Sequence, residues 1–244
     1  MIPKIIHYCW FGKGEMPDLV LQCIASWNRY LPAYEIMVWN EENFDVNLYQ
    51  YSKEAYDERK FAFVSDICRL YALKTVGGIY LDTDVEFLRP LDDAMLRDVA
   101  FTGFEGNFLL SSAIMGSMKE GQWINELLSY YHNRSFYLAN GALDLNPNTE
   151  SITAFMKEKK SLKTDNTLQV LSNYCTIYPS DYFSPKSWKT LKINITGNTY
   201  SIHHFAASWL QHSNYSTLGK LANLLLGKRI SDFLSKHYRK LKGS

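Results

Sequence analysis

Apolar and polar positions along the first 90 residues alternate between short apolar runs and longer stretches with helical spacing. The run at 4–10 predicts a buried first strand, the alternating segment 34–40 predicts a second strand, and 78–87 predicts the next one. The stretches at 17–31 and 60–78 repeat apolar side chains three and four residues apart, which predicts helices. Strands that alternate with helices form right-handed crossovers in a largely parallel sheet. The sequence therefore predicts an α/β fold whose ligand crevice lies beyond the carboxyl ends of the strands.

The pattern is weaker after residue 100. The segments 99–104 and 175–179 favour strands, 122–132 favours a helix, and 200–205 favours a late strand. No repeat or low-complexity linker interrupts the chain. A length of 244 residues suits one α/β core.

The last 30 residues differ from the rest in charge. Residues 215–244 hold seven Lys or Arg against one acid, Asp232, so they carry +6, and the first 214 residues carry −5 of the net +1. Apolar side chains recur there at helical spacing. We therefore predict one domain over residues 1–214 and a basic amphipathic helical tail over 215–244, which either packs on the domain or rests on an anionic membrane surface.

The composition limits which binding partners and which cellular compartment we expect for this protein. A net charge of +1 with 21% charged residues gives no field that would attract nucleic acid. The four cysteines lie far apart without a CxxC pair, which predicts neither a zinc site nor a disulfide framework. The apolar N-terminal stretch is too short for a signal peptide or a membrane span. We therefore expect a cytoplasmic protein.

Candidate chemistry is concentrated in the segment GGIYLDTDVEF, residues 77–87. In an extended chain, residues two apart point to the same side, so the carboxylates of Asp82 and Asp84 would both reach one divalent cation, directly or through water. Oxygen ligands suit a hard ion such as Mg²⁺ or Mn²⁺ that carries a diphosphate. The alternative is an ordinary acidic turn after a strand.

The preceding predicted helix contains a second pair of charges. Asp66 and Arg69 lie three residues apart, on one stripe with Ala62 and Leu73, and most other positions are apolar. Buried charges are costly unless they are paired. The two side chains either pair with each other, or Asp66 accepts hydrogen bonds from a sugar or ribose hydroxyl while Arg69 donates to sugar oxygens or phosphate.

These motifs together carry a resemblance. The run FAFVSDICRLYALKTVGGIYLDTDVEFLRPLDD, residues 61–93, resembles the core of glycosyltransferase family 32, the DXD sugar transferases that include bacterial capsular polysaccharide enzymes and yeast mannosyltransferases. It is also similar to the glucosyltransferase domain of the large clostridial-type cytotoxins. The resemblance implies a GT-A fold, a Rossmann-like nucleotide-sugar-binding architecture, with a nucleotide-sugar donor, a divalent cation and retention of the anomeric configuration.

The resemblance also implies roles for single residues. Following the cytotoxin pattern, Asp66 and Arg69 would contact the donor sugar and Tyr80 would lie at the nucleotide. Asp84 would be the firmer metal ligand, and Asp82 would bridge the metal and the ribose.

The segment HYCWFG, residues 7–12, looks like the first-strand segment whose tryptophan stacks on the uracil ring. Trp10 is then the base-stacking candidate, an interaction that contributes roughly 1–3 kcal/mol. The alternative is a tryptophan of the core. The likeness of this segment to uridine-diphosphate users favours uracil over guanine.

Near the end, SIHHFAASW, residues 201–209, resembles the segment that completes the metal shell and grips the diphosphate. His204 is the predicted metal ligand, with His203 as the alternative, and Ser208 and Trp209 are predicted at the phosphates. Each histidine alone is also compatible with a structural role, and the cytotoxins carry an acidic residue near this position. An imidazole ligand would favour Mn²⁺ over Mg²⁺.

The resemblance implies a retaining hexosyltransferase that moves galactose or glucose from a UDP-sugar to a glycan acceptor. A polyprenyl-diphosphate-linked acceptor would place it in bacterial surface polysaccharide synthesis, at the inner face of the cytoplasmic membrane. The departing phosphate can take the acceptor proton, so no strong enzymatic base is required. Three alternatives stay open: a GDP-mannose-dependent mannosyltransferase, a nucleotide-sugar hydrolase, and a non-catalytic nucleotide-sugar-binding module.

Overall fold

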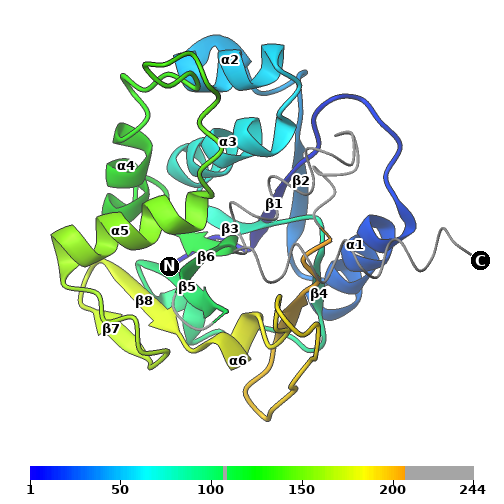
Figure 1. Ribbon diagram of the computed structural model, residues 1–244. Coiled ribbons are helices and arrows are strands. Elements are labelled where there is room, and N and C mark those ends of the chain that lie inside the picture. Colours follow the sequence, from blue (N-terminus) through cyan, green and yellow to red (C-terminus); the bar gives the residue numbers. More distant parts are fainter. Residues whose placement is uncertain (107–108, 207–244) are drawn as a thin grey trace, which may run out of the picture. The chain divides into compact units, whose positions relative to one another are not determined.

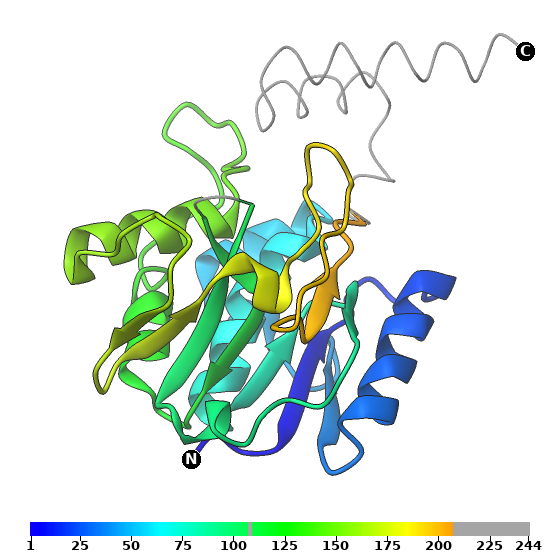
Figure 2. The same cartoon turned by 90° about the horizontal axis from the view of Figure 1, so that it is seen from below.

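A seven-stranded sheet forms the centre of the computed structural model, which describes residues 1–106 and 109–206 (Figure 1, Figure 2). The strands follow the order β2-β1-β3-β6-β5-β8-β7. Their bounds are β1 Ile5–Cys9, β2 Glu35–Trp39, β3 Gly78–Leu81, β5 Ala100–Glu105, β6 Leu109–Ser117, β7 Gln169–Leu171 and β8 Cys175–Tyr178.

The sheet is mixed but mostly parallel. β1 pairs in parallel with β2 and with β3, and β5 pairs in parallel with β8. β6 lies between β3 and β5 and is antiparallel to both, and β7 is antiparallel to β8 at the edge. Hence β2, β1, β3, β5 and β8 all run in one direction. The predicted α/β class with a mostly parallel central sheet is confirmed.

Helices cover both faces of this sheet. The helix α3 contacts β1 and β3, and α5 contacts β6. On the other face, α6 packs against β5, and α1 packs against β4 (Val85–Phe87), a strand outside this sheet (Figure 1). The helix bounds are α1 Asp18–Tyr30, α2 Gln50–Asp57, α3 Phe61–Thr75, α4 Gln122–Ser129, α5 Asn148–Lys160 and α6 Ser180–Phe183, with short 3₁₀ turns at Val46–Leu48 and Met95–Arg97.

Two hydrophobic clusters occupy the two faces, and β3 supplies side chains to both. Ile79 and Leu81 belong to the cluster that contains Trp27, while Tyr80 belongs to the cluster beneath α3. Successive side chains of a strand point to opposite faces, so a strand that is covered on both faces needs apolar residues at every position. This requirement accounts for the uninterrupted apolar run that precedes Asp82.

The segment predicted as one strand over 78–87 is instead two strands joined by a turn. β3 ends at Leu81, the backbone N–H of Val85 donates to the carbonyl of Asp82 over 3.0 Å, and β4 (Val85–Phe87) leaves the large sheet. β4 pairs with β9 (Ser201–His203) in a separate two-stranded sheet. Trp27 of α1 holds β4 there, because its indole N–H donates to the carbonyl of Val85 over 2.7 Å.

A pair of glycines ends α3 and starts β3. Gly77 and Gly78 have φ angles of +76° and +119°, which side-chain-bearing residues rarely adopt. A Cβ atom on Gly78 would lie 2.5 Å from the carbonyl oxygen of Ile5 on the neighbouring strand. The buried ring of His7 lies against the same junction, with Nε2 2.7 Å from the carbonyl oxygen of Gly77. Gly78 therefore permits close packing of β3 on β1, and Gly77 permits close packing against the backbone of Lys119.

We expect Gly78→Ala to lower the free energy of unfolding by more than about 3 kcal/mol, since the new methyl group meets backbone and the φ angle is strained. Chemical denaturation measures this change. Gly14→Ala is the matched control, because a Cβ at Gly14 meets nothing within 4 Å, and it should change stability by less than about 0.5 kcal/mol. Equal effects of the two substitutions would show that the close contact and the φ angle at Gly78 do not determine the loss of stability.

All four cysteines are free and buried. In the part of the chain that the structure describes, no helix has the length and apolar character needed to cross a bilayer. The predicted tail over 215–244, together with Ser208 and Trp209, lies outside the described residues.

Candidate functional site

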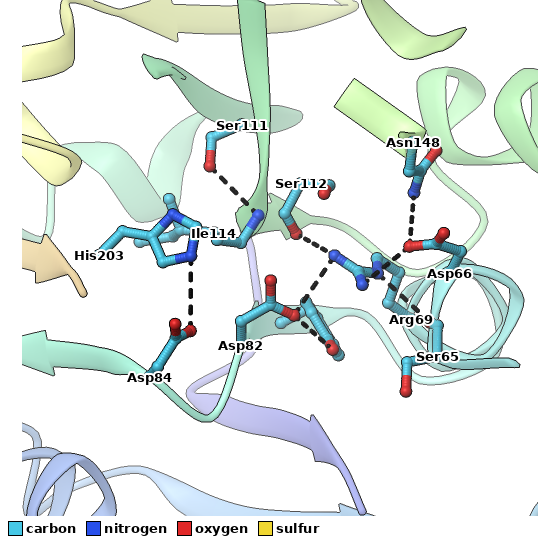
Figure 3. A network of polar contacts seen from close by, with 12 residues as sticks. Ser65, Asp66, Arg69, Asp82, Asp84, Ser111, Ser112, Ile114, Asn148 and His203 are labelled. Carbon is cyan, nitrogen blue, oxygen red and sulfur yellow. Dashed lines mark hydrogen bonds and ion pairs between the residues drawn. The ribbon is translucent and has the colours of Figure 1, made fainter. Parts of the chain in front are cut away.

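The acidic pair and a histidine meet beyond the carboxyl end of β3. Asp82 and Asp84 occupy the turn after β3, and the pairing of β4 with β9 places His203 opposite Val85. One ligand atom of each of Asp82, Asp84 and His203 lies within 4.8 Å of the others. Nε2 of His203 is 3.4 Å from Oδ1 of Asp84 (Figure 3). The turn therefore brings the two carboxylates together, although the extended strand from which we predicted their proximity is absent.

These three side chains suit a divalent cation. Two carboxylates supply the oxygen ligands that Mg²⁺ and Mn²⁺ prefer, and the imidazole favours Mn²⁺. Burial opposes protonation of His203, but the carboxylates of Asp84 and Glu105 raise the pKa of its imidazole well above the usual range. The electrostatic potential around His203 is therefore strongly negative. Three protein ligands would leave further coordination positions for water or phosphate oxygens.

The structure places His203, and not His204, beside the acidic pair. His204 was the predicted ligand, but its Nε2 lies 2.8 Å from Oε2 of Glu86, and its backbone N–H donates to the carbonyl of Asp84. His203, the alternative, joins the acidic pair. The physical reason is the alternation of side chains at a strand end, which sends neighbours to opposite sides.

We expect His203→Ala to weaken Mn²⁺ binding by at least about 100-fold, since loss of outer-shell partners alone costs 10- to 100-fold. His204→Ala should leave the affinity within about twofold, because the His204 ring faces Glu86. Titration of free Mn²⁺ by electron paramagnetic resonance measures both affinities. A stronger effect of His204→Ala would exclude the observed arrangement as the metal site.

A buried arginine of α3 connects the predicted charged pair to the acidic turn (Figure 3). Nη2 of Arg69 lies 2.9 Å from Oδ1 of Asp66, and Nη1 lies 3.4 Å from Oδ1 of Asp82. Nη1 also donates to the carbonyl of Ser112 over 2.6 Å, and Nε donates to the carbonyl of Ser65. Asp66 and Arg69 therefore pair with each other in the structure, which was one of the two alternatives for these charges. The guanidinium is directed at protein oxygens, which favours positioning of Asp82 over the predicted direct contact with sugar or phosphate.

Asp66 receives a further contact from a residue that sequence reasoning missed. Nδ2 of Asn148, the first residue of α5, donates to Oδ1 of Asp66 over 3.2 Å. Burial raises the pKa of Asp66 to about 6, Arg69 opposes the rise, and the charge of Asp82 adds to it. Burial also raises the pKa of Asp82, again opposed by Arg69. The carboxylates thus form one coupled cluster that a cation would stabilise.

Tyr80 lies beneath the site and not at its surface. Its side chain is 2% exposed, its hydroxyl donates to Oδ1 of Asp82 over 2.8 Å, and the guanidinium of Arg69 lies 4.6 Å from its ring centroid. Tyr80 therefore lies behind Asp82, whereas the resemblance had placed it beside the nucleotide. Because the strand alternates faces, Tyr80 points toward α3.

Trp10 directly follows β1, at the same edge of the sheet. It is half-buried and belongs to neither core cluster, so it is not the core tryptophan of the alternative interpretation. Its indole N–H donates to the carbonyl of Gly14 over 2.8 Å. A cavity of about 150 Å³ lies among residues that follow β1 and β2 and that flank the start of α3: Gly12, Lys13, Glu41, Tyr56, Arg59 and Phe61.

Comparison with known proteins agrees with this geometry. Residues 17–101 match the family model described as "Glycosyltransferase sugar-binding region containing DXD motif". The match spans α1 to the start of β5 and contains Asp66, Arg69, Asp82 and Asp84. The resemblance to DXD sugar transferases is thereby confirmed.

Individual relatives share the DXD region to different extents. The chain is 32% identical to Inositol phosphoceramide mannosyltransferase 3 of Schizosaccharomyces pombe over 44% of this chain and 33% of that protein. It is 24% identical to an uncharacterized glycosyltransferase of Acanthamoeba polyphaga mimivirus over 87% of this chain and 85% of that protein. Among solved structures, the PaToxG glycosyltransferase aligns with a TM-score of 0.49 and 17% identity, over 66% of this chain and 70% of that one. The chain spans only about a third of the length of the fission yeast relative.

Proposed function

We propose that this chain is a metal-dependent, retaining hexosyltransferase that moves galactose or glucose from a UDP-sugar to a glycan acceptor. The observation that carries the proposal is the juxtaposition of Asp82, Asp84 and His203 beyond β3 in a DXD sugar-binding region. Open α/β sheets bind ligands at this edge.

The described residues would hold the donor in three ways. Asp84, Asp82 and His203 would bind the cation, and Arg69 and Tyr80 would keep Asp82 in place. Asp66, the buried partner of Arg69, would accept a hydrogen bond from a sugar hydroxyl. Trp10 would stack on the base, and Ser208 and Trp209 would donate to the diphosphate. When bound, Mn²⁺ or Mg²⁺ would act as a Lewis acid that neutralises charge on the departing diphosphate.

The acceptor proton would pass to the departing phosphate, on the same face of the sugar that the acceptor attacks. The chain then needs to exclude water and orient the acceptor, and it needs no strong base. Attack from that face retains the anomeric configuration.

A second candidate is mannosyl transfer from GDP-mannose. The name of the fission yeast relative, a mannosyltransferase, favours this candidate. The likeness around Trp10 supports uracil. The two candidates share the metal site and differ in the base and the sugar.

The acceptor would be a glycan carried on polyprenyl diphosphate, used in bacterial surface polysaccharide synthesis such as capsule formation. The support is the excess of cations over 215–244, which would hold the enzyme at the inner face of the cytoplasmic membrane as a peripheral protein. Co-sedimentation with anionic vesicles should fall when residues 215–244 are deleted. Unchanged binding would remove this part of the proposal.

Differential scanning fluorimetry tests the donor site directly. The purified chain would be mixed with UDP, GDP, UDP-glucose, UDP-galactose or GDP-mannose, each with Mn²⁺, Mg²⁺ or EDTA. We expect one nucleotide to stabilise the protein, by about 2.7 kcal/mol at 100 times its Kd, and EDTA to remove the effect. Absence of any shift would overturn the proposal.

Product analysis then separates the classes of activity. Release of nucleoside diphosphate that depends on an added glycan indicates transfer. Release with donor alone indicates a hydrolase, and binding without release indicates a non-catalytic module.

A further inference from the structure

A third carboxylate faces the candidate metal ligand His203 from the opposite side. Glu105 is the last residue of β5, and its Oε2 lies 3.4 Å from Nδ1 of His203. The other ring nitrogen, Nε2, faces Asp84 at 3.4 Å. The imidazole is therefore placed between a carboxylate of the acidic turn and a carboxylate of the large sheet.

Glu105 is itself held in place. The hydroxyl of Ser111, a buried residue of β6, donates to Oε2 of Glu105 over 2.8 Å. The pairing of Glu105 with Leu109 fixes the backbone at this end of the β5–β6 hairpin. The carboxylate thus belongs to the seven-stranded sheet, while His203 belongs to the smaller two-stranded sheet.

Apart from the carboxylates of Asp84 and Glu105, few groups in the described part of the chain hold the ring of His203 in place. Its side chain is 12% exposed and that of Glu105 is 14% exposed. Among the described residues, Nδ1 of His203 is a buried nitrogen without a hydrogen bond. A buried polar nitrogen left unpaired is destabilising, and the carboxylate at 3.4 Å is the group that a small movement would bring into hydrogen-bond range. Phe205 limits rotation of the ring, with its centroid 4.1 Å away.

We propose that Glu105 is the positioning residue of the metal site: it accepts the Nδ1–H of His203 and thereby directs the lone pair of Nε2 toward Asp82 and Asp84. The inference rests on the metal dependence in the proposed function. A neutral imidazole binds a cation through the nitrogen that carries no proton, so the acceptor at the other nitrogen selects the tautomer. A carboxylate in this place also makes the ring a stronger ligand.

The test measures Mn²⁺ affinity of the full chain by electron paramagnetic resonance, without substrate. We expect Glu105→Ala to weaken binding by 10- to 100-fold, the usual cost of losing such a partner. Glu105→Gln, which keeps an acceptor but loses the charge, should weaken it by roughly three- to tenfold. Glu86→Gln is the matched control, since it changes the carboxylate that contacts the neighbouring His204, and should leave the affinity unchanged.

A nitrogen-15 NMR spectrum of the histidines provides a second readout, with Mg²⁺ as the diamagnetic cation. In the unsubstituted chain, Nδ1 of His203 should carry the proton and Nε2 should not. In Glu105→Ala, a higher Mg²⁺ concentration should be needed to reach this state, whereas a merely structural role of Glu105 would leave that concentration unchanged.

The outcomes are distinguishable. If the unsubstituted chain binds Mn²⁺ and both Glu105 variants bind it within twofold, the role of Glu105 is overturned while the metal site stands. If the unsubstituted chain binds no Mn²⁺, this inference and the metal dependence of the proposed function both fail. If Glu105→Ala does not fold, Glu105→Gln decides, because it preserves size and the contact with Ser111.

Discussion

Asp84→Asn is expected to reduce donor turnover by about a thousandfold or more while the fold stays intact. The substitution keeps the shape of the side chain and removes the charge that would bind the cation. Lewis-acid stabilisation is worth several kcal/mol in the transition state, and each 1.36 kcal/mol is a factor of ten in rate. The backbone carbonyl of Asp84, which accepts from the N–H of His204, is unaffected by the change.

Release of nucleoside diphosphate from the preferred donor measures this effect at several Mn²⁺ concentrations, and circular dichroism reports the fold. The control is Asp18→Asn, an exposed carboxylate in the first turn of α1 that should retain full turnover. Ordinary metal dependence with unchanged turnover in Asp84→Asn would show that the acidic turn is not the metal site.

The apolar pattern was sufficient for the elements that build the edge of this site. Apolar runs predicted β1 and β3, and alternating positions predicted β2. The run in β3 is uninterrupted because this strand is buried at every position. Gly77 and Gly78 correctly marked the end of α3, since their φ angles exclude other residues. The spacing of Asp66 and Arg69 also predicted their pairing as one alternative, because residues three apart share a helix face.

Contacts between segments that lie far apart in the sequence could not be predicted from apolar patterns and residue spacing. β6 was not predicted, because a central strand that carries Ser111, Ser112 and Ser117 lacks an apolar run. The buried hydroxyl of Ser111 is satisfied by its hydrogen bond to Glu105. Asn148 contacts Asp66 across 82 residues of chain, and no spacing rule covers that separation. The break after Leu81 depends on Trp27 holding β4.

Arg69→Met is expected to lower the free energy of unfolding by about 3–5 kcal/mol at pH 7.5, the largest stability effect predicted for this protein. Removal of one partner of a buried ion pair leaves an uncompensated charge. Arg69 is 4% exposed and lies against both Asp66 and Asp82, so its loss leaves two carboxylates without their cation. Arg29→Met, at an exposed position of α1, should cost less than about 0.5 kcal/mol.

The effect should depend on pH with a definite sign. The folded-state pKa of Asp66, about 6, lies above its ordinary value of 3.8, chiefly through burial. Such a group contributes stability that is fully present below pH 3.8 and is lost as the pH rises through about 6. Arg69 holds this pKa down, so in Arg69→Met the pKa rises further and the loss continues toward neutral pH.

Denaturation of the unsubstituted chain, Arg69→Met and Arg69→Met with Asp66→Asn, each at pH 5 and pH 7.5, tests the coupling. The destabilisation by Arg69→Met should be smaller at pH 5, where the carboxyl of Asp66 is protonated in the folded state. Asp66→Asn should restore part of the lost stability at pH 7.5, because it removes the charge that the arginine balanced. Equal destabilisation at the two pH values, or no recovery in the double variant, would mean that Arg69 stabilises the fold through its contacts with the Ser65 and Ser112 carbonyls and not through the carboxylates.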